Sequence, residues 1–136
     1  MNQQVVLDAS AVLAYLQGEP GSAAVEQALQ TQNCVVTAAN QAEIIAKALD
    51  RGVGTDAIQA ILAELPYAVV DVQAADGVLA GLMRPATRAW GLSLGDRLCL
   101  AVAQRLKARV LTADRTWLAL PDLPDLAVVC IRPDQH

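Results

Sequence analysis

The sequence predicts an α/β fold, in which a mostly parallel five-stranded sheet is flanked by helices. Short runs of β-branched and aliphatic residues alternate with longer segments whose apolar residues recur at helical spacing. The short runs are apolar almost throughout, which is typical of strands that a parallel sheet buries on both faces. The chain has 136 residues, of which 54% are hydrophobic and 18% charged. This length and composition predict one domain over residues 1–136, without an internal linker or repeat.

Five short apolar runs are the candidates for strands. The first, Val5-Val6-Leu7, ends on Asp8, and the fourth, Val110-Leu111-Thr112, is followed closely by Asp114. Bounded runs of this length suit buried strands, whereas helices need about ten residues or more. Because the runs alternate with helical segments, the sheet is expected to be mostly parallel. In chain order, the strands are predicted over residues 5–7, 34–37, 67–72, 110–112 and 126–131.

Helices are predicted between these strands, each bounded by a cap or a turn signal. The helix that follows Asp8 ends at the turn over residues 18–21. A later helix begins with Asn40 as its N-cap and has Glu43 three residues on, which is the spacing of a capping box. Residues 85–94 lack periodicity and are expected to form a loop or a frayed helix end. The other predictions are a helix over 23–30 capped by Ser22, one capped by Thr55 or Asp56 and ending at Pro66, and helices over 74–83, 96–107 and 115–120.

Cysteine and histidine usage narrows the chemistry. Cys34, Cys99 and Cys130 are odd in number, widely spaced and set in apolar stretches, which predicts free thiols in a reducing compartment. The absence of a Cys-x-x-Cys motif argues against a zinc or thiol-redox site. His136 is the only histidine and the last residue, which argues against Ser-His-Asp or Cys-His catalysis. No apolar run approaches the ~18 residues that cross a bilayer, and no signal peptide is recognisable, so a cytoplasmic protein without membrane contact is expected.

Charge is distributed unevenly along the chain. The net charge is −4, yet residues 1–83 carry −7 and residues 84–136 carry +3. A local basic surface can guide a polyanion even when the whole protein is acidic. The alternative is that each basic residue belongs to an ordinary solvated helix end.

Four carboxylates stand where the predicted strands end or the helices begin. Asp8 and Asp114 follow strands, whereas Glu43 and Asp96 open helices. Each has a local explanation: Asp8 and Asp114 could be N-caps, Asp96 could form a capping box with Ser93, and Glu43 could do so with Asn40 or pair with Lys47. In a parallel sheet, however, all four positions lie at the same edge. Carboxylates brought together repel each other unless a cation neutralises them, and oxygen ligands favour Mg²⁺ or Mn²⁺.

Four motifs together resemble those of PIN-domain nucleases. They are Val-Leu-Asp8-Ala-Ser10-Ala near the start, Glu43 at the opening of the third helix, Gly-Asp96-Arg-Leu-Cys-Leu-Ala-Val-Ala and Leu-Thr112-Ala-Asp114-Arg. The chain length is similar to that of VapC-type ribonuclease toxins of bacterial type II toxin–antitoxin modules. The resemblance covers essentially the whole chain.

The resemblance implies a single PIN-like domain with an acidic quartet at the carboxyl edge of the sheet. Asp8, Glu43, Asp96 and Asp114 would be the catalytic and metal-binding residues. The implied activity is Mg²⁺- or Mn²⁺-dependent cleavage of RNA, often tRNA or rRNA. The implied partners are a cognate antitoxin and a second copy of the chain. Ser10 and Thr112 would be supporting residues of the quartet.

Family members often carry a further acid shortly after the fourth, where this chain has Arg115-Thr116-Trp117. This difference leaves open whether one or two ions bind. Because the chain's only histidine, His136, is its last residue and is not expected to catalyse a cyclic-phosphate route, we expect cleavage to leave a 5′-phosphate and a 3′-hydroxyl. Side chains expected to contact the substrate are four arginines, which would bind phosphates, and one tryptophan, which would stack on a base or pack a helix end: Arg84, Arg88, Arg97, Arg115 and Trp90.

Two other classes of function compete with a nuclease. A phosphotransfer domain of the receiver type also gathers acids at strand ends, but it needs a lysine near the last strand, and the only lysines here, Lys47 and Lys107, fall on predicted helices. Phosphatases of the haloacid-dehalogenase type need Asp-x-Asp, where this chain has Asp8-Ala-Ser10. The third class is a PIN fold kept as a non-catalytic interaction module, against which the presence of all four acids argues.

Overall fold

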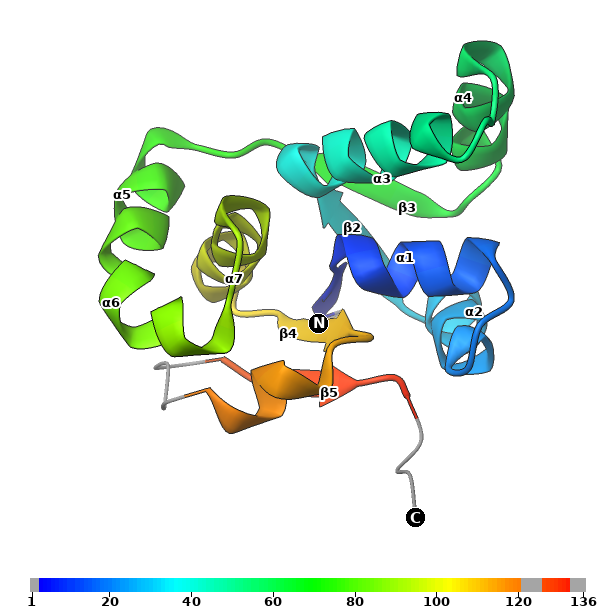
Figure 1. The fold of residues 1–136 in the computed structure, drawn as a ribbon. Helices are drawn as coiled ribbons and strands as arrows, with labels where there is room; N and C mark the ends of the chain where they lie inside the picture. Colours follow the sequence, from blue (N-terminus) through cyan, green and yellow to red (C-terminus); the bar gives the residue numbers. More distant parts are fainter. Residues whose placement is uncertain (1–2, 121–125, 133–136) are drawn as a thin grey trace.

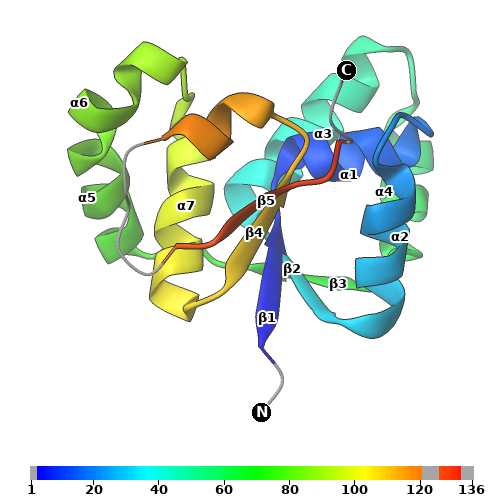
Figure 2. The same ribbon diagram turned by 90° about the horizontal axis from the view of Figure 1, so that it is seen from below.

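The computed structural model, which describes residues 3–120 and 126–132, contains a five-stranded sheet in which every strand pair is parallel. The strand order is β3-β2-β1-β4-β5, so β1 is the central strand (Figure 2). The α/β fold with a parallel sheet, predicted from the sequence, is therefore confirmed. The strands are β1 (Gln4–Leu7), β2 (Asn33–Thr37), β3 (Tyr67–Val70), β4 (Arg109–Thr112) and β5 (Val128–Cys130).

Helices cover both faces of this sheet (Figures 1 and 2). The first four helices pack on one face and the helices between β3 and β4 on the other, giving three layers. The helices are α1 (Ala9–Leu16), α2 (Ser22–Thr31), α3 (Ala38–Asp50), α4 (Thr55–Ala63), α5 (Ala74–Leu82), α6 (Arg84–Thr87) and α7 (Leu94–Leu106), with 3₁₀ helices η1 (Arg88–Trp90) and η2 (Arg115–Ala119).

The central strand supplies side chains to both hydrophobic layers. Val5 and Leu7 belong to the cluster under α1–α4, and Val6 belongs to the cluster under α5–α7. All three are at most 1% exposed. Successive side chains of a strand point to opposite faces, so a strand buried on both faces must be apolar at every position. This requirement explains the unbroken apolar run before Asp8.

The chain changes direction at β1, and this decides where a site can form. From β1 it proceeds to β2 and β3 on one side, then crosses the opposite face through α5–α7 and returns at β4, on the other side of β1. The carboxyl ends of β1 and β4 are thus neighbours, joined by pairing of Leu7 with Leu111. In open parallel sheets, ligands bind outside the carboxyl ends of the strands at such a switch point.

Three predicted helix caps are wrong by one to three residues. The N-cap of α2 is Gly21 rather than Ser22, that of α3 is Thr37 rather than Asn40, and that of α4 is Gly54 rather than Thr55 or Asp56. Thr37 accepts the backbone N–H of Asn40 through its hydroxyl, which leaves the Asn40 side chain free for tertiary contacts. Gly21 has a φ of +98°, and a Cβ there would collide with the backbone of Ile131.

The segment over residues 85–94, predicted as a loop or a frayed helix end, is largely helical. It forms α6 and η1, with the buried Thr87 donating its hydroxyl to the carbonyl of Met83. A four-residue helix has too few turns to show a period, so its sequence carried no helical signal. The third and fifth strands are also shorter than predicted, and the short helix predicted over 115–120 is the 3₁₀ helix η2.

The three cysteines are free thiols, as predicted, with Cys34 and Cys99 buried and Cys130 half-buried. Across residues 3–120 and 126–132, none of the helices has the length and apolar character needed to cross a bilayer.

Candidate active site

Asp8 ends the central strand and is the most buried of the four predicted acids. It is the N-cap of α1, where its Oδ1 accepts the backbone N–H of Ala11 at 2.8 Å. The residue is only 2% exposed. Burial, aided slightly by the negative charge of Asp96, raises the pKa of Asp8 from 3.8 to about 6, and hydrogen bonds from Thr112, Ala11 and Ser10 oppose this rise. Desolvation therefore outweighs three hydrogen bonds, and the site holds a carboxylate that is costly to ionise without a cation.

Two hydroxyls connect Asp8 to the turn after β4. Thr112 donates to Asp8 Oδ2 at 2.6 Å, and Ser10 donates to the same carboxylate at 2.8 Å. Both oxygens also accept backbone N–H groups of that turn: Ser10 Oγ from Ala113 at 2.9 Å and Thr112 Oγ1 from Asp114 at 3.0 Å. Ser10 and Thr112 thus join the ends of β1 and β4 across about a hundred residues of chain, rather than serving only as local turn hydroxyls.

Glu43 reaches this region from α3. Its Oε1 accepts a hydrogen bond from Asn40 Nδ2 at 2.7 Å, and Asn40 also donates to the carbonyl of Gly95 at 3.4 Å. A Cβ at position 95 would collide with the Glu43 carboxylate, so this carboxylate lies directly against the first turn of α7. Glycine at position 95 therefore makes room for Glu43 beside Asp96.

Asp96 lies in that same first turn of α7. Its Oδ2 accepts the backbone N–H of Ser93 at 2.9 Å, and Ser93 Oγ accepts the N–H of Asp96 at 3.1 Å, so the capping box considered from the sequence is present. A capping carboxylate keeps lone pairs free for other ligands, so a structural role for Asp96 and a functional one are compatible.

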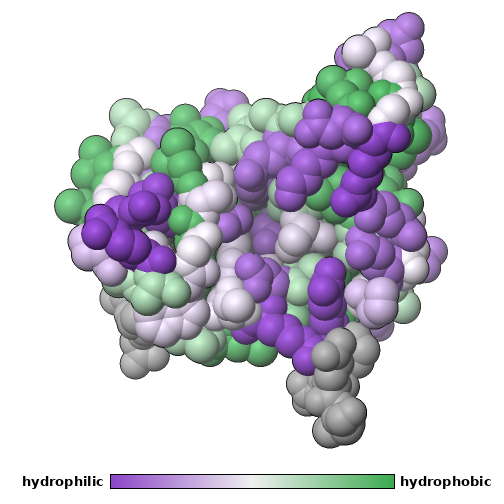
Figure 3. Space-filling view, viewed as in Figure 1, coloured by the Kyte–Doolittle hydropathy of each residue, from purple (hydrophilic) through white to green (hydrophobic). Residues whose placement is uncertain are grey.

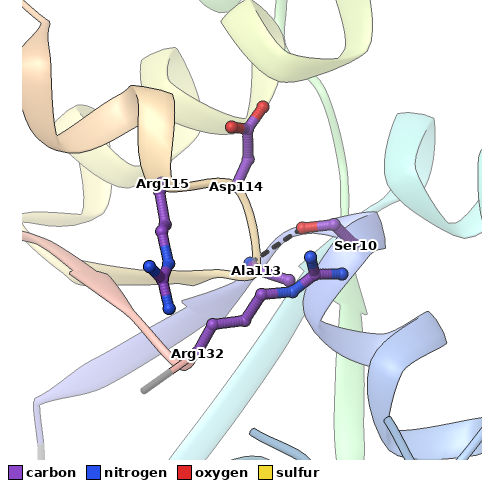
Figure 4. Close-up of a pocket in the computed structure, with 5 residues that line it drawn as sticks. All are labelled: Ser10, Ala113, Asp114, Arg115 and Arg132. Atoms are coloured by element: carbon purple, nitrogen blue, oxygen red, sulfur yellow. Dashed lines mark hydrogen bonds between the residues drawn. The ribbon is translucent and has the colours of Figure 1, made fainter. Parts of the chain in front are cut away.

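Asp114 is the exposed member of the four acids and lies in the turn after β4. Its Oδ1 accepts the backbone N–H and the hydroxyl of Thr116 at 2.9 and 2.7 Å. It lines a pocket of about 390 Å³ in which Ser10 and two arginines take part, as Figure 4 shows. Ser10 is the residue shared between this pocket and the Asp8 network.

The negative charges of three of the acids act on the buried thiol of Cys99. Burial raises its pKa well above the ordinary value, and the negative charges of Asp8, Asp96 and Glu43 raise it further. In the described part of the chain, none of the four predicted acids forms a salt bridge with a lysine or arginine. The face of the molecule seen in Figure 3 contains the carboxyl edge of the sheet. Hydrophilic side chains lie around a hollow at its centre.

The donor set fits a hard divalent cation. The ligands of such a cation would all be carboxylate or hydroxyl oxygens. No basic side chain neutralises Asp8 in the described residues, and burial raises the pKa of its carboxyl group. Within residues 3–120 and 126–132, however, no three acidic, histidine or cysteine side chains lie close enough together to form a ready-made metal site. The four predicted acids lie at one edge of the sheet, with Asp8 buried, Glu43 and Asp96 half-buried and Asp114 exposed at the rim.

The predicted substrate contacts fall into three groups. Arg84 and Arg88 are exposed on α6 and η1. Arg97 is half-buried and donates to the carbonyl of Ala80 at 2.9 Å, so it joins α7 to α5. Trp90 is half-buried against the hydrophobic cluster under α5–α7, which matches its packing alternative. Of the predicted contacts, only Arg115 lines the pocket that Ser10 and Asp114 also line.

Sequence reasoning missed two residues near this site. The sequence predicts Asn40 as a helix cap, whereas its buried side chain positions Glu43. The available signal is an amide one turn before the acid. Arg132 lines the Asp114 pocket from beyond β5 and gave no sequence signal at all. A further buried acid, Asp76, lies elsewhere and forms a salt bridge with Arg105 at 3.0 Å, so it belongs to the α5–α7 packing.

The fold and this edge define a class: parallel α/β proteins with a carboxylate-rich site at the topological switch point. A family model for the PIN domain matches residues 5–123. The protein therefore belongs to the PIN domain family, and the resemblance drawn from its motifs is confirmed. No curated protein sequence matches it significantly.

Solved structures share this fold over nearly the whole chain. VapBC-1 from nontypeable Haemophilus influenzae has a TM-score of 0.70 at 18% identity, covering 95% of this chain and 98% of that one. VapBC2 from Rickettsia felis, bound to a DNA fragment from their promoter, has 0.69 at 14%, covering 94% and 98%. FitAcB from Neisseria gonorrhoeae has 0.68 at 17%, covering 91% and 95%. At these identities the similarity establishes a common fold.

Proposed function

We propose that this protein is an endoribonuclease that depends on Mg²⁺ or Mn²⁺ and acts as the toxin of a toxin–antitoxin module. Its substrate would be structured RNA such as tRNA or rRNA, cleaved to a 5′-phosphate and a 3′-hydroxyl. Membership of the PIN domain family supports a nuclease. Structural likeness to proteins described as VapBC complexes supports the toxin role and a cognate antitoxin as partner. The proposal includes a homodimer.

The observation that carries the proposal is that Asp8 ends the central strand while the Glu43 carboxylate lies against the first turn of α7, which also holds Asp96, with no basic side chain paired to any of the three in the described residues. Each acid comes from a different element, and each is fixed by a hydrogen bond of its own. Uncompensated negative charge costs stability, so a fold that gathers it at a switch point favours a bound cation. If Asp8 served only to cap α1, the neighbouring carboxylates of Glu43 and Asp96 would not be needed.

A divalent ion at such a site supplies Lewis-acid polarisation of the scissile phosphate and a lowered pKa for attacking water. The chain's own contribution is to position oxygens. Asp8 is held by Ala11, Ser10 and Thr112, and Glu43 by Asn40, so neither carboxylate has to reorganise before ligand binding. In this proposal Asp8, Asp96 and Asp114 hold the ion, and Glu43 orients water or holds a second ion.

Of the five side chains predicted to contact RNA, the proposal keeps three as phosphate contacts. Arg115 lines the same pocket as Asp114, and Arg84 and Arg88 are free to approach a phosphate from the exposed surface of α6 and η1. Arg97 and Trp90 would act mainly by packing, because one bonds the carbonyl of Ala80 and the other lies against the core.

The test is cleavage of total tRNA and rRNA by purified protein with Mn²⁺, with Mg²⁺ and with EDTA. We expect 5′-phosphate products in either metal, none in EDTA, and at least a hundredfold loss for Asp8→Asn and Asp96→Asn. Asp50→Asn, which changes an exposed carboxylate at the far end of α3, is the matched control and should cleave normally. Cleavage that persists in EDTA or in both site variants would contradict the proposal.

The toxin role has a separate test. Induced expression in a bacterial host should arrest growth, and the arrest should be absent for Asp8→Asn expressed to the same level. Metal-dependent cleavage without growth arrest would support the nuclease and reject the toxin assignment. A folded protein inactive in every metal would favour the non-catalytic PIN module instead.

A further inference from the structure

Two arginines from distant parts of the chain share the pocket at the rim of the acidic site. Arg115 begins η2 directly after β4, and Arg132 follows β5. With Ser10, Ala113 and Asp114 they line a pocket of about 390 Å³. In Figure 4 both guanidinium groups lie on one side of the Ala113 turn, while the Asp114 carboxylate extends away from them.

These guanidinium groups have little to neutralise them. The Arg115 side chain makes no hydrogen bond or salt bridge within the described residues. Arg132 has one opposite charge nearby, Glu19 on the turn between α1 and α2, at 3.9 Å between Nη2 and Oε2. Both members of that pair are about 40% exposed or more, so the attraction is weak and easily exchanged. Arginine binds phosphate oxygens in a planar, bidentate way, and such charge-assisted bonds are the stronger ones.

The position of Arg132 is fixed by the same strands that carry the acids. The N–H of Ile131 donates to the carbonyl of Thr112 at 2.8 Å, which continues the β4–β5 pairing to the residue that bonds Asp8. Ile131 is buried, and Gly21 makes room for its backbone. Arg132 therefore leaves the sheet edge at a defined point, one residue beyond a contact with the active-site strand.

We propose that Arg115 and Arg132 together form a phosphate-binding site for the RNA backbone next to the scissile bond. The inference deepens the proposed nuclease function and rests on it for the identity of the polyanion. The pocket opens beside Ser10, which donates to Asp8, so a phosphate held there belongs to a strand passing over the acids. Glu19 competes with that phosphate for Arg132 and weakens binding. In an acidic protein this pair supplies the local positive charge that the site needs.

The test measures binding of a fluorescein-labelled single-stranded oligouridylate by anisotropy, in EDTA and at several salt concentrations, so that no cleavage occurs. We expect Arg115→Gln and Arg132→Gln each to weaken binding about tenfold. Each should also reduce the slope of log K against log salt by about 0.7, the value for one phosphate contact on a single strand. Arg51→Gln, at the exposed end of α3, is the matched control and should change neither quantity.

Glu19→Gln separates a phosphate site from a merely structural ion pair. If Arg132 binds phosphate, removing Glu19 should tighten RNA binding two- to threefold, opposite in direction to Arg132→Gln. Glu64→Gln, an exposed acid on the far side of α4, corrects for the change in net charge and should have a smaller effect. If the pair only braces the α1–α2 turn, Glu19→Gln and Arg132→Gln should both lower Tm and should change binding in the same direction.

Three results would overturn the inference: no measurable binding by the wild type at low salt, an unchanged affinity and salt slope in Arg132→Gln, or recovery of an acidic peptide rather than RNA as the pocket's ligand. These are distinguishable from failure of the nuclease proposal. If the wild type cleaves RNA in Mn²⁺ and Arg132→Gln binds normally, only the arginine site is rejected. If the wild type never cleaves but both arginine variants lose RNA binding, the phosphate site stands and the nuclease does not.

Discussion

Thr112 Oγ1 lies 2.6 Å from Asp8 Oδ2, although 104 positions separate the two residues in the chain. Both groups are buried, and the same Thr112 oxygen accepts the N–H of Asp114. One hydroxyl thus fixes the carboxylate at the end of β1 and the backbone at the end of β4. The ends of β1 and β4 at the switch point are thus joined by side-chain hydrogen bonds as well as by backbone strand pairing.

Replacing Thr112 with valine should test this link. The change keeps the shape and the β-branched side chain but removes a donor to a buried carboxylate and an acceptor for Asp114, so we expect a loss of ~2–3 kcal/mol in the free energy of unfolding. Urea unfolding at pH 7.5 measures it. Thr112→Ser, which retains the hydroxyl, should lose less than half as much. Equal losses for the two variants would mean that packing, not the hydrogen bond, matters.

The pKa of Asp8 gives the protein a pH dependence with a defined sign. Because the folded-state pKa is raised from 3.8 to about 6, the folded protein binds this proton more tightly than the unfolded chain does. Stability should therefore rise as pH falls through 6 and level off near 4, by ~3 kcal/mol in total. Measuring wild type against Asp8→Asn in EDTA isolates this contribution, since the variant lacks the titrating group. A difference that stays constant from pH 4 to 8 would contradict the burial argument.

Metal addition should stabilise the wild type and not the site variants. A ligand that binds only the folded state adds ~2.7 kcal/mol at a hundredfold excess over its Kd, which corresponds to several degrees in Tm for a chain of this size. Mn²⁺ should raise the Tm of the wild type and of Asp50→Asn, and EDTA should reverse the shift. Asp8→Asn and Asp96→Asn should show little response. A rise of the same size in all four proteins would indicate binding elsewhere.

Gly95 offers a test of how Glu43 is accommodated. A Cβ at this position would lie 2.7 Å from Glu43 Oε2, so Gly95→Ala must displace the carboxylate. We expect Gly95→Ala to lower cleavage as strongly as Glu43→Gln does, with the fold retained. Gly77→Ala in α5 is the matched control, because its Cβ meets nothing within 4 Å and alanine should stabilise the helix by ~0.5–1 kcal/mol. Full activity in Gly95→Ala would mean that the position of Glu43 is not critical.

The strands and the main helices could be predicted because their signals are local. The apolar run Val5–Leu7 and the stripe of Val25, Ala28 and Leu29 state directly which side chains a sheet or a helix must bury, and all are buried. The caps were less predictable. Asn40 is a common capping residue, yet Thr37 caps α3, because the chain leaves β2 one turn earlier than the polar spacing indicated. Short elements such as α6 contain too few residues to show a period.

From the amino-acid pattern alone, the chain is predictable as a parallel α/β domain with four acids at positions that such a sheet brings to one edge. The three-dimensional arrangement decided that the charges of Asp8, Glu43 and Asp96 reach the Cys99 thiol and that Asp114 lines a pocket with two arginines. It also decided that Asn40 positions Glu43 and that Arg132 lies beside Arg115. The physical reason is that periodicity records burial within one element, whereas these contacts depend on which strand ends become neighbours. That neighbourhood is fixed by the order β3-β2-β1-β4-β5 and by the packing of α7 against α3, neither of which any single segment encodes.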